Sequence, residues 1–310
     1  MERKTDIEQE MFRNLSLEIL KILSISPEEL IENLENDFYK NNRGVLENLK
    51  IVFNTKGDVN VNNGKFKKIL ELLRDKGLSS AVTSLDVSFG FLTELNGIEQ
   101  LTALTKLDVA DNRLTTLPGI EQLTALIELN VSNNQLTTLP DIEQLTALRN
   151  LNVARNRLTT LMGIAKLKEL RILNVSHNQL TTLKDIEQLK ELRNLYVNHN
   201  QLTTLKDIEQ LKELRSLGVS YNQLTTLKDI EQLKELTILN VSYNQLTTLI
   251  IAKLKELTIL DVNHNQLTTL KDIGQLTALI VLNVSHNQLT TLMGIPKLKG
   301  LIHLYVNRNQ

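Results

Sequence analysis

An asparagine recurs along the chain at a nearly constant interval, and this spacing constrains the fold more than any other feature. Successive asparagines are 22 residues apart except for one step of 21, and each lies in a near-copy of LxxLxVxxNxLTTLxxIxxLxx; they are Asn112, Asn134, Asn156, Asn178, Asn200, Asn222, Asn244, Asn265, Asn287 and Asn309. A period of about 20 to 29 residues is typical of a solenoid, in which each unit adds one strand to a parallel sheet. The sequence therefore predicts an α/β solenoid that acts by binding.

Each repeat carries seven apolar positions that one repeat cannot bury alone. In the unit around Asn200 they are Leu192, Leu195, Val197, Leu202, Leu205, Ile208 and Leu211. Stacking of neighbouring repeats is predicted to bury them in a continuous core. Each asparagine follows a strand, where its amide can satisfy turn backbone groups, so the asparagine ladder is predicted to be structural. The LxxLxVxxN blocks begin at about Val82 and number eleven, and the first has Gly90 in place of asparagine.

The pattern resembles the 22-residue leucine-rich repeats of bacterial internalins, over residues 82–310. It is also similar to the leucine-rich regulatory subunit of a serine/threonine phosphatase. The resemblance implies a right-handed horseshoe with parallel strands on the concave face and short 3₁₀ or helical turns on the convex face. It also implies that the concave face recognises proteins. The predicted fold is thus a leucine-rich repeat horseshoe of about eleven strands with a helical N-terminal cap domain.

Residues 1–80 lack the repeat and are predicted to form the cap, with residues 81–310 as the repeat domain. Apolar residues at helical spacing predict helices over residues 7–22, 27–38 and 65–76, the last ending at Gly77. Residues 45–53 fit a helix or a strand. Residues 58–64 resemble the start of a calcium loop, but Gly64 and Ile69 stand at the wrong places for it, so a turn is predicted. The segment from Ile25 to Ile31 is faintly similar to an F-box opening, without the rest of that motif.

Composition narrows the possible partners and the compartment. The chain has 35 Lys and Arg against 36 Asp and Glu, so no global field attracts it to nucleic acid or to a membrane surface. It has no Cys, which excludes disulfides and suits a reducing cytoplasm. No Sec signal or transmembrane segment is apparent, so a cytoplasmic location is predicted, with non-Sec translocation into a host as the alternative. Residues 1–80 contain no His, no Cys and no nucleotide-binding glycine loop, so neither an enzyme nor a cofactor is predicted.

The large polar and aromatic side chains gather in a few columns of the repeat. Leu and Val of LxxLxVxxN point inward, so positions three, five and seven are predicted to face the concave surface and position eight to border it. Position eight holds His177, His199, Tyr221, Tyr243, His264, His286 and Arg308. Neighbouring strands are about 4.8 Å apart, so these side chains are predicted to form one continuous row. Position three holds Ile238, Ile259, Val281 and His303, the first three forming an apolar patch expected beside that row, and position five holds Tyr196 and Tyr305.

These residues predict a protein or peptide partner, since aromatic and arginine anchors carry most interface energy. One alternative is that the rings only stack to stabilise the strands. Metal binding by the histidines is a weaker alternative, because ligands repeating along a flat ladder do not converge on one ion. The setting is either a bacterial host-directed effector or adhesion-type protein, or an intracellular regulatory or scaffold subunit that modulates an enzyme such as a phosphatase. Binding is expected to depend on pH through the four histidines of the row.

Two irregularities carry further predictions. The convex segment from Leu249 to Leu254 is one residue shorter than its equivalents, which predicts a local pinch or shift of the solenoid. The chain ends at Gln310, directly after the eleventh strand. This predicts either a natural chain that continues or self-association through the uncapped last repeat.

Overall fold

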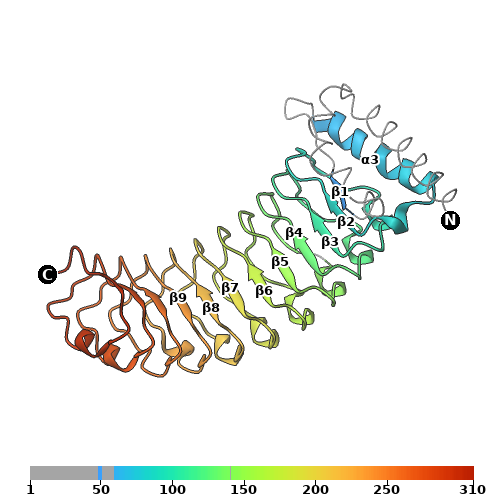
Figure 1. Cartoon of the computed structure of the whole chain (residues 1–310). Coiled ribbons are helices and arrows are strands. Elements are labelled where there is room, and N and C mark those ends of the chain that lie inside the picture. The colour runs from blue at the N-terminus through green and yellow to red at the C-terminus, as the bar shows by residue number, and fades with distance from the viewer. Residues whose placement is uncertain (1–47, 51–58, 140) are drawn as a thin grey trace. The chain divides into compact units, whose positions relative to one another are not determined.

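The computed structural model describes residues 48–50, 59–139 and 141–310 of the chain (Figure 1). It divides into two compact units, Met1–Asn134 and Gln135–Gln310, which we call unit 1 and unit 2. Each is described by itself. The helices predicted over residues 7–22 and 27–38, and the F-box-like segment, lie outside the described residues.

Unit 1 contains strands β1 to β4, in chain order and all parallel: β1 (Asn48–Lys50), β2 (Ser84–Asp86), β3 (Lys106–Asp108) and β4 (Glu128–Asn130). Helix α3 (Val59–Asp75) precedes the first repeat, and three-residue 3₁₀ helices follow it: η1 (Ser79–Ala81), η2 (Ile98–Gln100) and η3 (Ile120–Gln122). The segment that fitted either a helix or a strand thus contributes a strand, β1, which pairs with the first repeat strand.

Helix α3 caps the repeats, as predicted. Its apolar face is buried, including Phe66 and Leu70, and an added Cβ at Gly97 would lie 3.3 Å from the Leu70 side chain. The buried amide of Asn62 donates a 2.9 Å hydrogen bond to the carbonyl of Gly90, which stands where later repeats have asparagine. The turn predicted over residues 58–64 is wrong, because α3 begins at Val59, and Asn62 and Asn63 within it donate hydrogen bonds to Gly90 and Thr93 of the first repeat.

Unit 2 contains β5 (Asn150–Asn152), β6 (Ile172–Asn174), β7 (Asn194–Tyr196), β8 (Ser216–Gly218), β9 (Ile238–Asn240), β10 (Ile259–Asp261), β11 (Val281–Asn283) and β12 (His303–Tyr305). Each strand pairs in parallel with the next, in a register that matches equivalent residues of successive repeats. The opposite side, which we call the turn side, carries η4 (Ile142–Gln144), η5 (Ile164–Lys166), η6 (Ile186–Gln188), η7 (Ile208–Gln210), η8 (Lys228–Ile230), η9 (Ile273–Gln275) and η10 (Ile295–Lys297). The eleven predicted repeat strands are confirmed as β2 to β12.

The asparagine ladder is a hydrogen-bonding element of the core, as predicted. Asn222 is typical: its side-chain oxygen accepts a 2.9 Å bond from the Leu202 N–H of the preceding repeat. Its amide nitrogen donates to the carbonyls of Val197, Val219 and Ser220 at 3.0–3.2 Å. One buried side chain therefore satisfies four backbone groups and joins two repeats.

The repeat of 21 residues differs from the others on the turn side, where one residue is missing. No 3₁₀ helix forms between β9 and β10, and Ile251 is buried while Ile250 is exposed. The strand register is unchanged, with Ile238 opposite Ile259, and Asn265 continues the ladder. The predicted local irregularity is therefore a shortened turn without any shift of the strands.

Inserting Gly between Ile250 and Ile251 is expected to leave the free energy of unfolding unchanged or to raise it slightly. The insertion creates Leu-Ile-Gly-Ile-Ala-Lys-Leu, which closely matches residues 161–167, where Gly163 adopts φ 86° directly before η5. Thermal and urea unfolding of both chains measure the effect. A loss of more than about 2 kcal/mol, typical of a damaged core, would show that the short turn is required.

Candidate protein-binding face

Six aromatic rings form a continuous stack along one edge of the unit 2 sheet. They come from position eight of six successive repeats: His177, His199, Tyr221, Tyr243, His264 and His286, which we call the ring row. Neighbouring ring centroids are 3.8–4.0 Å apart, and the planes lie within 10–19° of parallel. The row predicted from the sequence is therefore present in the structure, with a regular face-to-face geometry.

The backbone conformation at position eight determines the direction in which each ring leaves the chain. Every residue of the ring row has a positive φ of 51–55°, so the chain turns sharply at this point. The N–H of each one donates to a carbonyl of the next repeat, as from Tyr221 to Ser242 at 3.0 Å. The following residue is a buried ladder asparagine. The side chain of position eight is thus held at its base while its ring is left outside the core.

The fold does not require a ring at position eight. In unit 1 this position is Phe89 in the first repeat but Asp111 and Asn133 in the next two, with nearly the same φ of 57°, 55° and 53°. Asn, Asp and His are enriched in this left-handed conformation, whereas a bulky residue such as Tyr221 is disfavoured. The stacking of one ring pair contributes about 0.5–1.5 kcal/mol, which offsets the cost of placing a tyrosine in this left-handed conformation. The rings are therefore compatible with the repeat, but asparagine serves the backbone equally well.

Partial burial and neighbouring charges lower the pKa of the histidines at the two ends of the ring row. Partial desolvation, then the neighbouring His199 and then Arg155, lower the pKa of His177. At the other end, partial desolvation, then His264 and Arg308, lower the pKa of His286. Two stacked imidazoles therefore resist becoming positive together, and the adjacent guanidinium groups add to this effect.

The two tyrosines in the middle of the row are linked. A side-chain hydrogen bond with Tyr243 raises the pKa of Tyr221, and desolvation and the charge of Tyr243 raise it further. A shallow, open depression of about 600 Å³ lies beside this part of the row. Its lining consists of the rings from Tyr221 to His286, the ladder asparagines and the exposed glutamines Gln223, Gln245 and Gln266.

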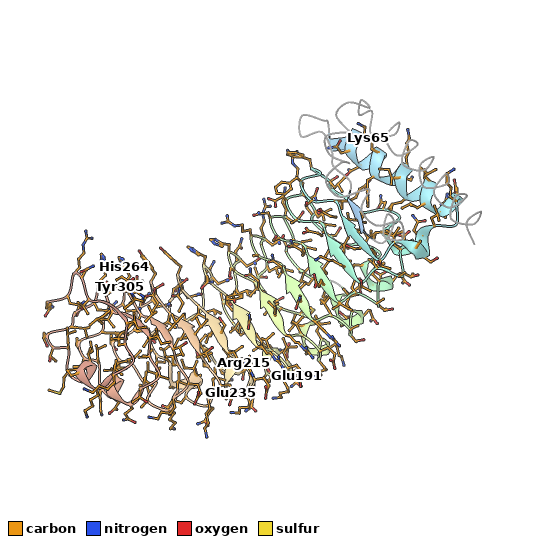
Figure 2. All side chains as sticks on the ribbon, in the orientation of Figure 1. Lys65, Glu191, Arg215, Glu235, His264 and Tyr305 are labelled. Atoms are coloured by element: carbon orange, nitrogen blue, oxygen red, sulfur yellow. The ribbon has the colours of Figure 1, made fainter. Side chains whose placement is uncertain are left out.

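Figure 2 shows the two sides of unit 2. His264 and Tyr305 lie together at one edge of the repeats, whereas Arg215, Glu191 and Glu235 lie at the other. These three charged side chains are thus well separated from His264 of the ring row.

The apolar patch exists, but not beside the ring row. Ile238, Ile259 and Val281 lie opposite one another in the register of β9, β10 and β11. They stand at the first residue of each strand, whereas the ring row follows the last. Five residues of extended chain separate positions three and eight, a distance of up to about 16 Å. The patch and the row therefore flank a polar floor from opposite sides.

Tyr196 lies apart from the ring row, over a gap in the floor that the sequence analysis missed. Its ring carbon and the amide of Asn198 would be 3.1–3.2 Å from a Cβ at Gly218. In other repeats the position-five side chain accepts a hydrogen bond from the serine at position seven of the same repeat, as Asn240 does from Ser242. Gly218 has no side chain to accept this bond. The Ser220 N–H and hydroxyl therefore donate to Asn198 of the preceding repeat, at 2.9 and 2.8 Å. A lone glycine in an otherwise polar column was the signal that could have revealed this packing.

The remaining predicted site residues lie at the last strand. His303 lies opposite Val281 and extends the position-three column, and Tyr305 lies opposite Asn283. Both side chains are exposed. Arg308 follows at position eight, with φ 53°, beyond His286.

Within the described ranges no three His, Cys, Asp or Glu side chains are placed to hold a metal ion. In the same ranges none of the helices has the length and apolar character that crossing a bilayer requires.

Comparison with known proteins identifies the repeats. Family models described as leucine-rich repeats match residues 102–158, 168–213 and 235–257. No curated protein matches the sequence significantly. A leucine-rich repeat protein of Leptospira interrogans is 38% identical, with a TM-score of 0.74, and the match covers 79% of this chain and 63% of that one. The functional domain of InlJ from Listeria monocytogenes is 32% identical, with a TM-score of 0.60, over 74% and 54% of the two chains.

A third structure, the internalin InlF of Listeria monocytogenes, shares the fold at 23% identity and a TM-score of 0.55, over 82% of this chain and 90% of that one. The chain spans less than two thirds of the length of the first two relatives. The repeat pattern, the parallel strands, the asparagine ladder and these matches agree. The chain is a leucine-rich repeat protein of the internalin-like kind.

Proposed function

We propose that this chain is a non-enzymatic interaction protein that binds a protein or peptide partner on the strand face of unit 2, centred on the ring row. The observation that carries the proposal is a stack of six partly exposed rings at a position where the fold accepts asparagine or aspartate. Leucine-rich repeat proteins are typically interaction modules, and the fold supports that class of function.

Stacking alone is the competing explanation for the rings. Exposed cross-strand pairs contribute about 0.2–1 kcal/mol each, so five pairs would give a useful gain in stability. Stacking does not account for the neighbouring depression or for the exposed glutamines that help to line it. Tyr221 and Tyr243 are also among the exposed large side chains of the chain, at 42% and 38%. A binding surface accounts for all three features.

The biological setting we propose is that of a host-directed effector or adhesion-type protein, which the internalin-like repeats support. The alternative is a regulatory or scaffold subunit that holds an enzyme such as a phosphatase. We also propose that residues 1–80 act mainly as the cap of a repeat domain formed by residues 81–310. Self-association through β12 stays a prediction, supported by the exposure of Ile302 and Leu304.

Substitution of both central tyrosines should test the binding face. We expect Tyr221→Asn with Tyr243→Asn to weaken partner binding at least about 30-fold, since buried aromatic anchors typically contribute 2 kcal/mol or more. Asparagine suits the backbone because Asn133 occupies the same position. Partners are captured from bacterial and host-cell lysates with the unsubstituted chain, and the affinity of each captured partner is then measured.

Lys206→Glu on the turn side is the matched control, and it should leave binding within about twofold. The opposite pattern, in which the lysine substitution removes binding and the tyrosine substitutions do not, would place the interface on the turn side. The lysate that supplies the partner separates the host-directed setting from the intracellular one.

A further inference from the structure

The ring row presents ring edges rather than ring faces. Because the six rings stack at 3.8–4.0 Å, each inner ring has both faces covered by its neighbours. A sugar or base that stacks on an aromatic face therefore finds no free face inside the row. The edges carry the imidazole nitrogens and the tyrosine hydroxyl groups, which form hydrogen bonds. The row is therefore suited to a ligand with many hydrogen-bonding oxygens.

Few carboxylate side chains lie in the repeat positions around the ring row. Over residues 150–310, positions five, seven, eight and ten contain three arginines, Arg155, Arg157 and Arg308, and one carboxylate, Asp261. Three positive charges less one negative leave a net charge of +2 on this face, although the whole chain is at −1. Asp261 is itself occupied, since one carboxylate oxygen accepts from the backbone and side-chain nitrogens of Asn263 at 3.0 and 2.6 Å.

The same columns in unit 1 have the opposite character. There they hold three carboxylates, Asp86, Asp108 and Asp111, and one arginine, Arg113, which leaves a net charge of −2. The repeat pattern thus accepts acidic residues at these positions, and their near absence beside the ring row is a property of unit 2 and not of the fold.

We propose that the ring row binds an extended acidic peptide, whose carboxylates accept hydrogen bonds from the imidazole, phenol and glutamine groups. This rests on the proposed function, because it names the chemistry of the partner at the same face. Five centroid spacings of 3.8–4.0 Å make the row about 20 Å long, which matches about six residues of extended chain. Arg155 and Arg308 extend the positive surface past both ends.

Binding of such a peptide takes up protons. Desolvation lowers the pKa of His177 and of His286 in the free protein, and repulsion from His199 and Arg155, or from His264 and Arg308, lowers it further. A bound carboxylate offsets this repulsion and raises the pKa. Because the bound state then holds more protons than the free state, affinity rises as pH falls.

Titration of a labelled, N-acetylated octa-aspartate by fluorescence anisotropy tests the inference with the full chain. Aspartate stays ionised at about pH 5.5. At low, constant ionic strength we expect binding at least about tenfold tighter at about pH 5.5 than at about pH 7.5, the change that one coupled proton produces over roughly one pH unit. Octa-asparagine and octa-lysine should bind more weakly than octa-aspartate at both pH values.

Two fourfold variants provide the controls. One replaces the histidines of the row by asparagine, His177→Asn, His199→Asn, His264→Asn and His286→Asn, and should abolish the pH dependence. The other removes four exposed lysines of the turn side, Lys184→Gln, Lys206→Gln, Lys228→Gln and Lys271→Gln, and should leave affinity within about twofold. Circular dichroism melting checks that both fold.

The inference is overturned if octa-aspartate binds no tighter than octa-asparagine, or if the lysine variant weakens binding as much as the histidine variant. The proposed function can survive that result. A captured partner that is lost with the Tyr221 and Tyr243 substitutions, yet is indifferent to pH and to the histidine variant, would retain the binding face and exclude the acidic peptide. A partner indifferent to all of them would exclude both.

Discussion

Asn222→Ala is expected to lower the free energy of unfolding by about 3 kcal/mol. The side chain of Asn222 satisfies the Leu202 N–H and three carbonyls, and it is 8% exposed, so water cannot replace it. A buried donor or acceptor left without a partner costs about 1–3 kcal/mol. Urea unfolding measures the total effect, and hydrogen exchange of the Leu202 amide measures the local one.

Two further substitutions test whether the loss of stability in Asn222→Ala comes from the loss of these hydrogen bonds. Gln223→Ala changes the exposed neighbour and should alter stability by less than about 0.5 kcal/mol. Asn222→Asp keeps an acceptor for the Leu202 N–H but sets a carboxylate against three carbonyls, so it should destabilise at least as much as alanine. A cost below about 1 kcal/mol for Asn222→Ala would mean that the ladder contributes little net energy.

Leu217→Ala is expected to destabilise unit 2 by about 3 kcal/mol, within the range for leucine truncation in a packed core. Leu217 is fully buried in β8, opposite Leu195 and Leu239 of the adjacent strands. Leu304 occupies the same repeat position in β12 but is 38% exposed. Leu304→Ala should therefore cost less than about 1 kcal/mol, because less apolar area leaves water in the folded state. Denaturant unfolding at low protein concentration compares the pair.

The comparison has a second use at high protein concentration. If Leu304→Ala then becomes as costly as Leu217→Ala, the β12 side chain is covered by another chain, as the predicted self-association requires. If the cost of Leu304→Ala stays small at every concentration, self-association through this strand is excluded.

The sequence predicted the repeat architecture well because each level of information agrees. The 22-residue period sets the strand spacing, the seven apolar positions set the inward face, and each Asn sits where turn backbone groups need a partner. The ring row followed from strand spacing alone. What the period could not predict is the positive φ at position eight, although a column of Asn, Asp and His there is the composition that this conformation favours.

The errors arose where a local feature depends on a neighbouring repeat. The apolar patch was expected beside the ring row because columns were counted without the length of the strand between them. The place of Tyr196 as a binding residue stays a prediction, because its side chain is partly exposed, but its packing beside Gly218 of the next repeat could not be predicted from its own repeat. The polar residues before Lys65 suggested a turn, but the carbonyl of Gly90, which lies 28 residues beyond Asn62, provides a partner that favours the helix.

The positive φ at position eight also has a consequence for how such a chain can diversify. Each of the six repeats of the ring row contributes one ring, and the positive φ at position eight is nearly the same in every copy of the repeat. Gain or loss of a whole 22-residue unit therefore lengthens or shortens the row by one ring, without disturbing the others. Because contacts are confined to adjacent repeats, the number of rings offered to a ligand can change in whole steps by recombination, and affinity can be adjusted without redesign of the core.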